Sequence, residues 1–442
     1  MGIILQIIRY YFSIIFWNTQ SKERIKRMQL RKFKEIFEYA REKCPFYREI
    51  YTKAGVLDLD IKTWDDVEKI PIVDKELMRK YSFDMLTTCD TNSKNVVTCY
   101  TSGSTGEPFK LAYSKFANTA AYFRVLYVML KVAKYNPLKK ITLLSKYDYN
   151  EKFKVENNIG ILKKVQDYFG LFKRDIISIF ENPSVIVYKL LESKPYILYS
   201  SSSAVDIVAN YVIENKIKIH IPYIILIAEP LSDEQYNKFK NCFNSNVIDI
   251  YGAKESPSLG YEINKNGYYS LFPNSNIFEF IDIHSTEVGE KGTVVVTNII
   301  NQVQPFIRYN LKDYADINND YEFGITKLGH IVGRISDILT FPDGTKLFHY
   351  CISQLYIDFN YAQRYKFLQI GNGPIEMHIL PNKDVDRNII IEDALRRWNK
   401  KYNHYDLIVK IVDNLPIDSK TGKFKVIEHK HNTNEENEII NR

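Results

Sequence analysis

The chain is organised around one polar stretch, Tyr100-Thr101-Ser102-Gly103-Ser104-Thr105-Gly106-Glu107-Pro108-Phe109-Lys110. Four hydroxyl side chains and two glycines fall within residues 101–106, and apolar runs flank them at 96–100 and 109–113. Glycine lets a backbone come close to a ligand, and successive N–H groups with hydroxyls form a pocket for anionic oxygens. A polar turn between two strands would have the same composition. We interpret the stretch as a phosphate-binding loop, but not as a Walker A loop, because the Gly-Lys-Ser/Thr ending is absent.

The composition is that of a globular protein with an apolar core. Of the 442 residues, 45% are hydrophobic and 26% are charged, and the length allows one large domain and a smaller one. The net charge of +7 is modest and does not indicate a nucleic acid partner, which requires a concentrated basic face. The five cysteines form no C-x-x-C pair, and the eight histidines form no H-E-x-x-H motif. We therefore expect reduced thiols, a cytoplasmic location and no catalytic metal site built from protein ligands alone.

Residues 1–20 form an amphipathic segment that precedes a basic one. Between Ile3 and Trp17 apolar residues recur at helical spacing, with polar residues, Arg9 among them, on the other side. The run is short for a membrane span, and the bulky residues after it are unlike a signal-peptide cleavage site. A basic run follows, so that residues 3–34 together suit the inner face of an anionic membrane. A helix docked on the core or in a homodimer would show the same pattern, and both interpretations stay open.

The order of the apolar segments predicts an α/β fold. Strand-like and helix-like segments alternate from residue 114 to residue 250, which indicates βα units around a largely parallel sheet. Beyond Tyr251 the segments become β-rich, and from about Ser336 a small α/β unit follows, with a helix expected at 392–402. We predict an amphipathic segment at 1–20, a large domain at 21–335, a small domain at 336–430 and a loose tail at 431–442. The expected strands lie at 141–144, 196–199, 223–227 and 247–250 in the parallel sheet, and at 365–369, 376–380 and 407–412 in the small domain.

Five further motifs follow the polar stretch. The first two, Ala228-Glu229-Pro230 and Tyr251-Gly252-Ala253-Lys254-Glu255, each come after a strand that is expected to be buried. Loops at the carboxyl ends of parallel strands are where α/β sheets bind ligands. The third, Arg308-Tyr309-Asn310-Leu311-Lys312-Asp313, ends with an acid that is able to accept hydrogen bonds from ribose hydroxyls. The last two are Gly333-Arg334-Ile335-Ser336-Asp337, where the sequence texture changes, and a glycine turn that places Lys423 near the carboxyl end.

These motifs resemble, in identity, spacing and order, those of the adenylate-forming superfamily of acyl- and aryl-coenzyme A ligases. The resemblance covers about residues 28–428 and is strongest to the phenylacetate–coenzyme A ligase branch and its relatives from capsular-polysaccharide loci. It implies a large multi-layer N-terminal domain and a small mobile α+β C-terminal domain that rotates between two half-reactions. It also implies ATP and Mg²⁺ as cofactors, a small-molecule carboxylate as substrate, pyrophosphate as leaving group and coenzyme A as the default acyl acceptor.

The resemblance implies a role for each motif residue. Hydroxyls and N–H groups of the polar stretch would hold the β- and γ-phosphates. Tyr251 would stack on adenine, and Glu255 would coordinate Mg²⁺. Lys423 would reach the carboxylate and the α-phosphate, where negative charge develops. The implied site residues are Thr101, Ser102, Gly103, Ser104, Thr105 and Gly106 for the phosphates, Glu229, Pro230, Tyr251 and Gly252 for the base, Asp313 with Arg334 for the ribose, Glu255 for the metal, and Lys423 with Glu255 for catalysis.

Four departures from the family pattern bear on the second half-reaction. Lys254 stands where a Thr or Ser usually precedes the glutamate, which removes a hydroxyl and adds a charge that would suit an anionic substrate. Ser336 stands at the usual Asp or Lys hinge, Asn310-Leu311-Lys312 lacks the customary Thr-Gly, and Tyr261–Asn264 lacks the usual cysteine. The ATP machinery is intact, so the departures leave open which acceptor takes the acyl group. The two alternatives are an amide- or ester-forming ligase of surface-polysaccharide assembly, with a sugar or amine acceptor, and a catalytically silent nucleotide-binding scaffold.

Overall fold

The structure is a computed structural model in which the chain divides into two units. The first comprises residues 1–137 and 248–331, and the second comprises residues 138–247 and 332–442. Residues 101–108, Ser336 and Lys423 lie outside the described residues, so the roles predicted for them stay predictions, as do the predicted domain boundaries. The described residues are 2–100, 109–145, 172–286, 289–317, 323–334, 338–343, 346–348, 352, 355–356, 359, 361–370, 373–382, 385–416 and 424–430.

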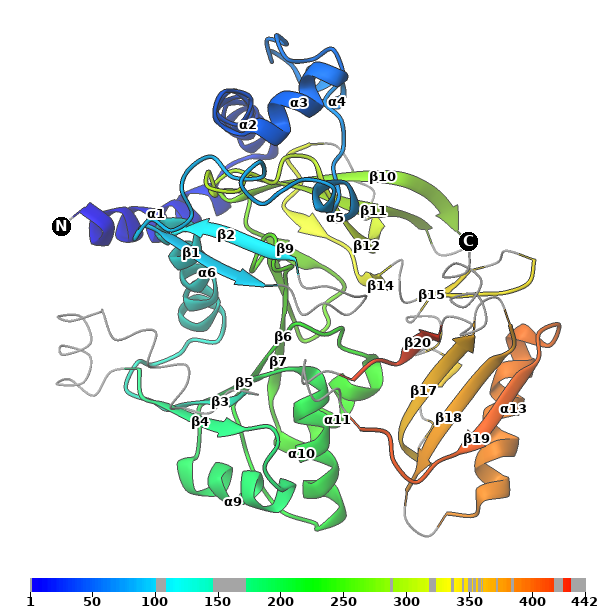
Figure 1. The fold of residues 1–442 in the computed structure, drawn as a ribbon. Helices are drawn as coiled ribbons and strands as arrows, with labels where there is room; N and C mark the ends of the chain where they lie inside the picture. The colour runs from blue at the N-terminus through cyan, green and yellow to red at the C-terminus, as the bar shows by residue number, and fades with distance from the viewer. Residues whose placement is uncertain are drawn as a thin grey trace. The chain divides into compact units, whose positions relative to one another are not determined.

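Five helices precede the polar stretch among the described residues (Figure 1), and α2, α3, α4 and α5 contribute buried apolar residues to one core of the first unit. Ser21 begins α2 by accepting a hydrogen bond from the Arg24 N–H group at 3.4 Å. Pro45 stands at the first position of α3, where a missing N–H group costs no helical hydrogen bond. Helix α2 buries Phe33 and Phe37 completely. The helices are α1 (Gly2–Asn18), α2 (Lys22–Lys43), α3 (Pro45–Lys53), α4 (Trp64–Glu68) and α5 (Lys75–Arg79).

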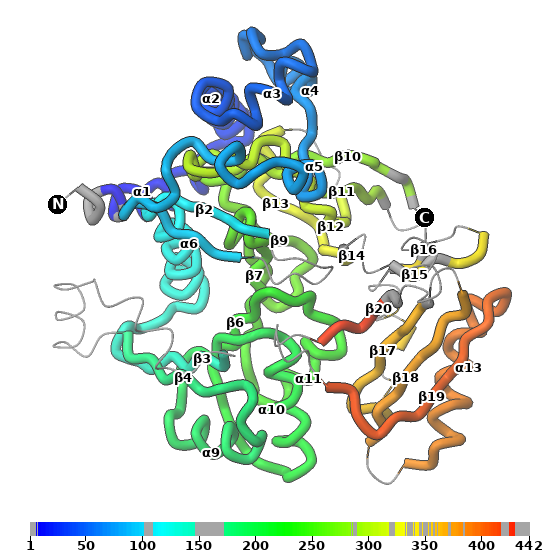
Figure 2. Tube along the Cα trace, viewed as in Figure 1, coloured from blue at the N-terminus to red at the C-terminus, as the bar shows by residue number. Residues whose placement is uncertain are grey.

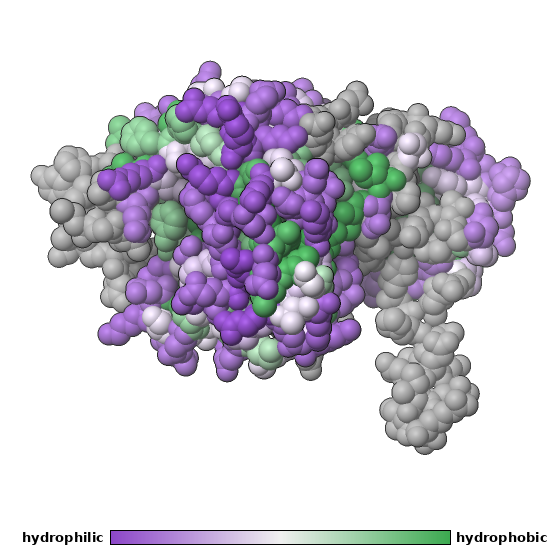
Figure 3. All heavy atoms as spheres, turned by 90° about the horizontal axis from the view of Figure 1, so that it is seen from above, coloured by the Kyte–Doolittle hydropathy of each residue, from purple (hydrophilic) through white to green (hydrophobic). Residues whose placement is uncertain are grey.

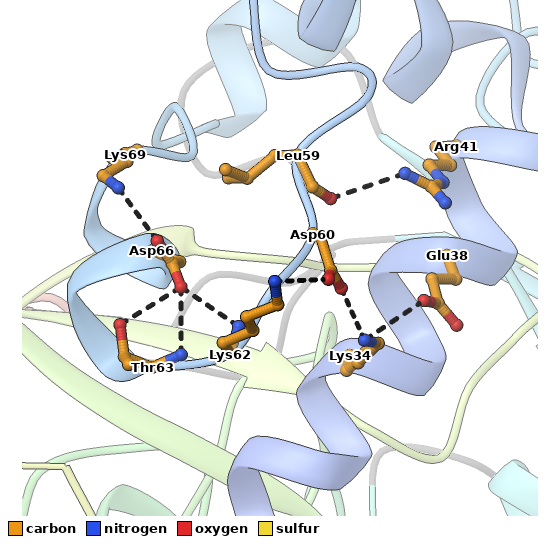
Figure 4. Close-up of polar contacts among 9 residues, drawn as sticks. All are labelled: Lys34, Glu38, Arg41, Leu59, Asp60, Lys62, Thr63, Asp66 and Lys69. Carbon is orange, nitrogen blue, oxygen red and sulfur yellow. Dashed lines mark hydrogen bonds and ion pairs between the residues drawn. The ribbon is translucent and has the colours of Figure 1, made fainter.

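Ion pairs and hydrogen bonds on the surface connect the segment before α4 to α2 (Figure 4). Lys34 of α2 donates to Asp60 at 2.6 Å, and the Asp66 carboxylate accepts from the Thr63 N–H group at 3.0 Å. Hydrogen bonds from Lys69 and from two backbone N–H groups hold the pKa of Asp66 well below its usual range. Exposed pairs of this kind contribute little stability each, so the buried residues fix this segment. Figure 3 shows a face on which most of the coloured residues are hydrophilic, with some hydrophobic residues among them.

Antiparallel strands build the rest of the first unit. Strands β1 and β2 pair so that Tyr100 lies opposite Lys110. These two residues are the first and the last of the polar stretch. Helix α6 follows β2 directly, capped by Ser114, and ends in a π-helical turn at Val128–Val132. Strands β7, β8, β9 and β13 pair antiparallel in this order, as do β10, β11 and β12. The elements are β1 (Val96–Tyr100), β2 (Lys110–Ser114), α6 (Lys115–Tyr127), β7 (Asn246–Tyr251), β8 (Gly260–Ile263), β9 (Tyr269–Leu271), β10 (Asn276–Thr286), β11 (Gly289–Asn298), β12 (Tyr309–Ile317) and β13 (Lys327–Leu328). Strand β14 (Ile331–Arg334) begins at the last residue of this unit.

The first part of the second unit confirms the predicted βα units. Four strands lie parallel in the order β6-β5-β3-β4, and helices pack beside them (Figure 1). Their core joins Leu198 of β5, Val205 of α10 and Phe239 of α11, each of which is fully buried. Strand β7 then carries the chain into the first unit. The elements are β3 (Ile141–Ser145), β4 (Arg174–Ser178), α9 (Pro183–Ser193), β5 (Ile197–Ser200), α10 (Ser202–Glu214), β6 (Tyr223–Ile227) and α11 (Asp233–Phe243).

The last part of the chain forms a four-stranded sheet in the order β19-β18-β17-β20, with helix α13. The predicted strands are confirmed, but the predicted helix begins five residues earlier, at Arg387, because Asp386 caps it there. Strand β20 was not predicted, and it lies parallel to β17 (Figure 2). The core here centres on Trp398, Tyr356 and Phe367. The elements are β15 (Ile338–Thr340), β16 (Lys346–Phe348), β17 (Ala362–Ile370), β18 (Ile375–Pro381), α13 (Arg387–Tyr402), β19 (Leu407–Ile411) and β20 (Ile427–Lys430).

Candidate functional site

A sharp turn follows β7 and carries two of the predicted site residues. Backbone hydrogen bonds of 3.2 Å close the turn, and Gly252 is required in it because a Cβ atom there would lie 2.6 Å from the Ser258 nitrogen. Arg124 of α6 donates to two carbonyl groups just beyond the turn, at 2.6 and 2.9 Å. The turn is therefore held from both sides, which fixes Tyr251 and Glu255 at the carboxyl end of β7.

Tyr251 and Asp313 lie in direct contact, although 62 residues separate them. The phenolic O–H group of Tyr251 donates to Asp313 Oδ2 at 2.8 Å, and both side chains are buried. The Tyr251 ring is tilted by 54° against Tyr269, with the ring centroids 5.7 Å apart. The residues predicted for adenine and for ribose are thus neighbours, as the two halves of adenosine require. The stacking role of Tyr251 itself stays a prediction.

Glu255 is a buried carboxylate that accepts a hydrogen bond from a phenol. Its side chain is 9% exposed, and Oε1 accepts a hydrogen bond from the Tyr309 hydroxyl at 3.2 Å. Burial, aided by the nearby Glu255 charge, raises the pKa of Tyr309, so this phenol remains a hydrogen-bond donor at neutral pH. Within the described part of the chain Oε2 has no hydrogen-bond partner. Glu255 therefore has one oxygen that Tyr309 orients and one that bonds no described residue.

These residues fit a divalent cation that is shared with a nucleotide. The described residues contain no group of three or more His, Cys, Asp or Glu side chains that could hold a metal ion by themselves. Mg²⁺ is commonly bound through one or two carboxylates together with substrate phosphates and water. Glu255 is able to supply one such carboxylate, which is what a Mg²⁺ ion shared with phosphate groups needs from the protein.

Glu229 is placed differently from Glu255. Its carboxylate accepts hydrogen bonds from the Ser203 N–H group at 2.8 Å, from the Ser203 hydroxyl at 3.0 Å and from the Ser202 hydroxyl at 3.1 Å. These donors belong to the first turn of α10, where a negative charge is favoured by the helix dipole. The preceding residue, Ala228, has a φ of +70°, a strained value for a residue with a side chain. Glu229 therefore stabilises α10, and its role with Pro230 in a base pocket stays a prediction.

Within the motif that ends at Asp313, the other charged residues are structural. Arg308 forms a buried ion pair with Glu279 at 2.8 Å and donates to three carbonyl groups between Val67 and Ile70. Lys312 lies 2.8 Å from Glu76 and also pairs with Asp74. Arg334 ends β14, and only its backbone is described. Tyr309 was not selected as a site residue from the sequence. Its position inside this motif is the signal that could have identified it.

A second buried acid, Asp249, lies on β7 two residues before Tyr251. It accepts a hydrogen bond from the Tyr269 hydroxyl, and Glu262 is its cross-strand partner on β8. Burial raises the pKa of Asp249 to about 7, with the Glu262 charge acting in the same direction. The strand that carries the candidate site therefore contains a carboxyl group that titrates near neutral pH.

A cavity of about 620 Å³ lies beside α1 in the first unit. Helix α1 contributes Gln6, Arg9, Tyr10 and Ser13 to its wall. The other lining residues are Tyr39, Thr88, Cys89, Ser114, Phe116, Ile300, Gln302 and Val303. None of the predicted site residues that the structure describes lines this cavity.

Comparisons with known proteins found relatives that match along most of the chain. No family model matches the sequence. Protein CapK of Staphylococcus aureus is 22% identical over 405 residues, which span 87% of this chain and 86% of CapK. The phenylacetate–coenzyme A ligase of Pseudomonas putida is 22% identical over 342 residues, which span 73% of each chain.

Solved structures show the same fold. A crystal structure of 2-hydroxyisobutyryl-CoA ligase in the post-adenylation state, in complex with R3-HIB-AMP, matches with a TM-score of 0.72. The match is 16% identical and covers 96% of this chain and 92% of the ligase. The α/β fold expected from the sequence is therefore confirmed.

Proposed function

We propose that this chain, a homologue of Protein CapK and of the phenylacetate–coenzyme A ligases with the fold of an acyl-coenzyme A ligase, is an ATP- and Mg²⁺-dependent ligase. In the first step a carboxylate oxygen attacks the α-phosphorus of ATP, the bond to the β-phosphate breaks, and an acyl-adenylate and pyrophosphate result. In the second step a nucleophile attacks the acyl carbon and AMP leaves. The default nucleophile is the thiol of coenzyme A.

The contact between Tyr251 and Asp313 is the observation that supports this proposal most strongly. Adenine and ribose are joined in ATP, so the groups that bind them must be adjacent. The two residues come from different motifs and meet at 2.8 Å, and Glu255 follows Tyr251 on the same turn. These positions support an adenosine subsite beside a metal-binding carboxylate near the carboxyl end of β7, where α/β sheets bind ligands.

Each remaining residue has a defined task in this proposal. Glu255 would hold Mg²⁺, which neutralises charge on the departing pyrophosphate. Tyr309 fixes the Glu255 carboxylate through its hydroxyl. The stretch 101–106 would bind the β- and γ-phosphates, and Lys423 would supply positive charge at the α-phosphorus as the pentacovalent centre forms.

A pyrophosphate-release screen over aryl, fatty, amino and uronic acids tests the proposal. At least one acid should give release that depends on ATP and Mg²⁺, and Lys423→Ala should abolish it while ATP binding persists. If the wild-type protein binds ATP but releases no pyrophosphate with any acid, it is a catalytically silent nucleotide-binding scaffold and not a ligase.

The acceptor has a second candidate, an amine or hydroxyl group of a sugar. The match to Protein CapK favours it, because that match spans 87% of the chain, against 73% for the phenylacetate–coenzyme A ligase. The enzyme would then form an amide or ester in the assembly of a surface polysaccharide. Omission of coenzyme A separates the two: a thioester ligase stops after adenylation, whereas the alternative acylates an added amino sugar without coenzyme A.

We also infer a peripheral membrane contact through α1. Tyr10, Ile14 and Trp17 bury one side of this helix, whereas Ile8, Phe12 and Phe16 are 45–62% exposed on another. Spaced four residues apart, the exposed residues form an apolar stripe, and the basic run of α2 follows it in the chain. No described helix is long and apolar enough to cross a bilayer. The stripe therefore suits the interface of an anionic leaflet.

Vesicle flotation with phosphatidylserine tests this contact. Phe12→Ser with Phe16→Ser should abolish binding, because both changes spare the buried side of α1. Tyr188→Ser on α9 is the control, since it removes an equally exposed aromatic side chain (67%) from another surface. If the wild-type protein ignores the vesicles but sediments as a dimer that the double variant dissociates, a second copy occupies the stripe instead.

A further inference from the structure

Lys254 joins the turn after β7 to both strands that flank the polar stretch. Its Nζ donates to the Tyr100 carbonyl at 2.9 Å, and Tyr100 is the last residue of β1. The hydroxyl of Tyr113, on β2, donates to the backbone carbonyl of Lys254. Tyr113 is 4% exposed, and this second contact is partly buried. One residue thus connects the Glu255 turn to the β1–β2 hairpin through its side chain and its main chain.

The Lys254 ammonium is a cation without an acid partner among the described residues. It donates one hydrogen bond to a neutral carbonyl group, which uses one of its three N–H donors. The Lys254 residue is exposed. Lys312, by contrast, is compensated by two carboxylates within 3.2 Å. Among the residues that the structure describes, no carboxylate offsets the charge of Lys254, whereas two offset that of Lys312.

Lys254 precedes the carboxylate that is suited to a metal. The two residues are consecutive, so one turn carries an exposed ammonium group and a buried carboxylate. A magnesium–polyphosphate complex has the complementary pair of charges, since the metal would bind the carboxylate and phosphate oxygens would bind the ammonium. A simple carboxylate substrate would pair with the ammonium but would bring no metal for Glu255. The arrangement therefore favours phosphates as the partner of Lys254 over the anionic acyl substrate that the sequence alone suggested.

We propose that Lys254 is a phosphate-binding residue of this chain, held in position by Tyr100 and Tyr113. The inference rests on the proposed function and adds to it a residue for binding the Mg²⁺–triphosphate group. A lysine brings a full charge and a long reach to a place where a hydroxyl would only donate one hydrogen bond.

Titration calorimetry with Mg²⁺–ATP and with Mg²⁺–pyrophosphate, at low and high salt, tests this inference without knowledge of the acyl substrate. Lys254→Met should raise Kd for both ligands about tenfold and flatten its salt dependence, because a screened charge interaction is lost. Lys254→Arg should stay within about threefold of the wild type, since it keeps the charge. Lys327→Met, which removes an exposed charge from β13 of the same unit, should change neither Kd nor the salt dependence.

Two results would overturn the inference. One is equal binding by the wild type and by a folded Lys254→Met variant. The other is an equal loss in Lys254→Met and Lys327→Met, which would indicate a general effect of net charge. If Lys254→Met does not fold, the Lys254→Arg comparison decides, because a tenfold loss there would exclude a role carried by charge. A wild-type protein that binds neither ligand would overturn the proposed function, and this inference with it.

Discussion

Two glutamates follow two buried strands, yet the protein uses them differently. Glu229 comes two residues after β6, and three hydrogen bonds commit its carboxylate to the start of α10. Glu255 comes four residues after β7, and its carboxylate accepts one hydrogen bond, from Tyr309. An acid at the carboxyl end of a buried strand is therefore not enough to mark a metal ligand. What distinguishes Glu255 is an oxygen with no partner in the described part of the chain.

The largest expected effect comes from Glu255→Gln, which keeps the shape of the side chain and removes its charge. Pyrophosphate release should fall about 10³-fold, equivalent to about 4 kcal/mol, because Mg²⁺ loses its protein carboxylate. The melting temperature should stay close to that of the wild type, since the amide oxygen still accepts from Tyr309. If the rate of pyrophosphate release falls by less than tenfold, Glu255 is not a metal ligand.

The strand beneath Glu255 should make stability depend on pH. The pKa of Asp249 is raised to about 7 from an ordinary value near 3.8, so the folded state binds this proton more tightly than the unfolded state. Its stabilising effect is complete below about pH 4 and is lost as pH rises through 7, a change on the order of 4 kcal/mol.

Urea denaturation of wild type and Asp249→Asn between pH 4 and pH 8 measures this dependence. The wild type should lose stability relative to the variant across this window, because asparagine carries no proton to lose. Parallel curves at all pH values would show that Asp249 is ionised in the folded protein throughout.

Glu229→Ala should act on stability more than on chemistry. It leaves the donors of the first turn of α10 without their acceptor, so the free energy of unfolding should fall by about 2 kcal/mol. Glu214→Ala, at the exposed far end of the same helix, should change it by less than about 0.5 kcal/mol. Chemical denaturation compares the two. An unchanged stability in Glu229→Ala, accompanied by weaker ATP binding, would make Glu229 a ligand residue like Glu255.

Tyr309→Phe should have the smallest effect, because it removes only the hydroxyl that orients Glu255. We expect adenylation to slow about fivefold, roughly 1 kcal/mol, with a higher Mg²⁺ requirement. Tyr47→Phe is the matched control, since it removes a buried phenol that bonds only the backbone. Titration of Mg²⁺ against the initial rate distinguishes them, and equal curves for both variants would contradict a positioning role for Tyr309.

Much of the fold could be predicted from the sequence because its buried strands are short apolar runs between turn signals. Strands β3, β5, β6 and β7 are largely buried on both faces, so they are mostly apolar along their length, although β7 contains the buried Asp249. Strand β20 was missed because it is brief and carries charged residues. The start of α13 was placed too late because its first residues are mixed, and the cap at Asp386 sets the boundary.

The candidate site could be predicted only as a set of motifs. Their order indicated that Tyr251, Glu255 and Asp313 act together, and the contact between Tyr251 and Asp313 agrees with that grouping. The contacts of Lys254 with Tyr100 and Tyr113 could not be predicted, because more than 140 residues separate the partners and only the paired strands bring them together. Nor does a sequence reveal that Glu229 has its hydrogen bonds satisfied by a helix.

Carboxylate-dependent exchange of labelled pyrophosphate into ATP tests the central claim most directly, because it requires a reversible acyl-adenylate and no acceptor. The account predicts exchange by the wild type with at least one carboxylic acid, absence of exchange without the acid, and a loss of about 10³-fold in Glu255→Gln. Exchange that proceeds equally well in Glu255→Gln, or ATP binding with no exchange for any acid, would contradict it.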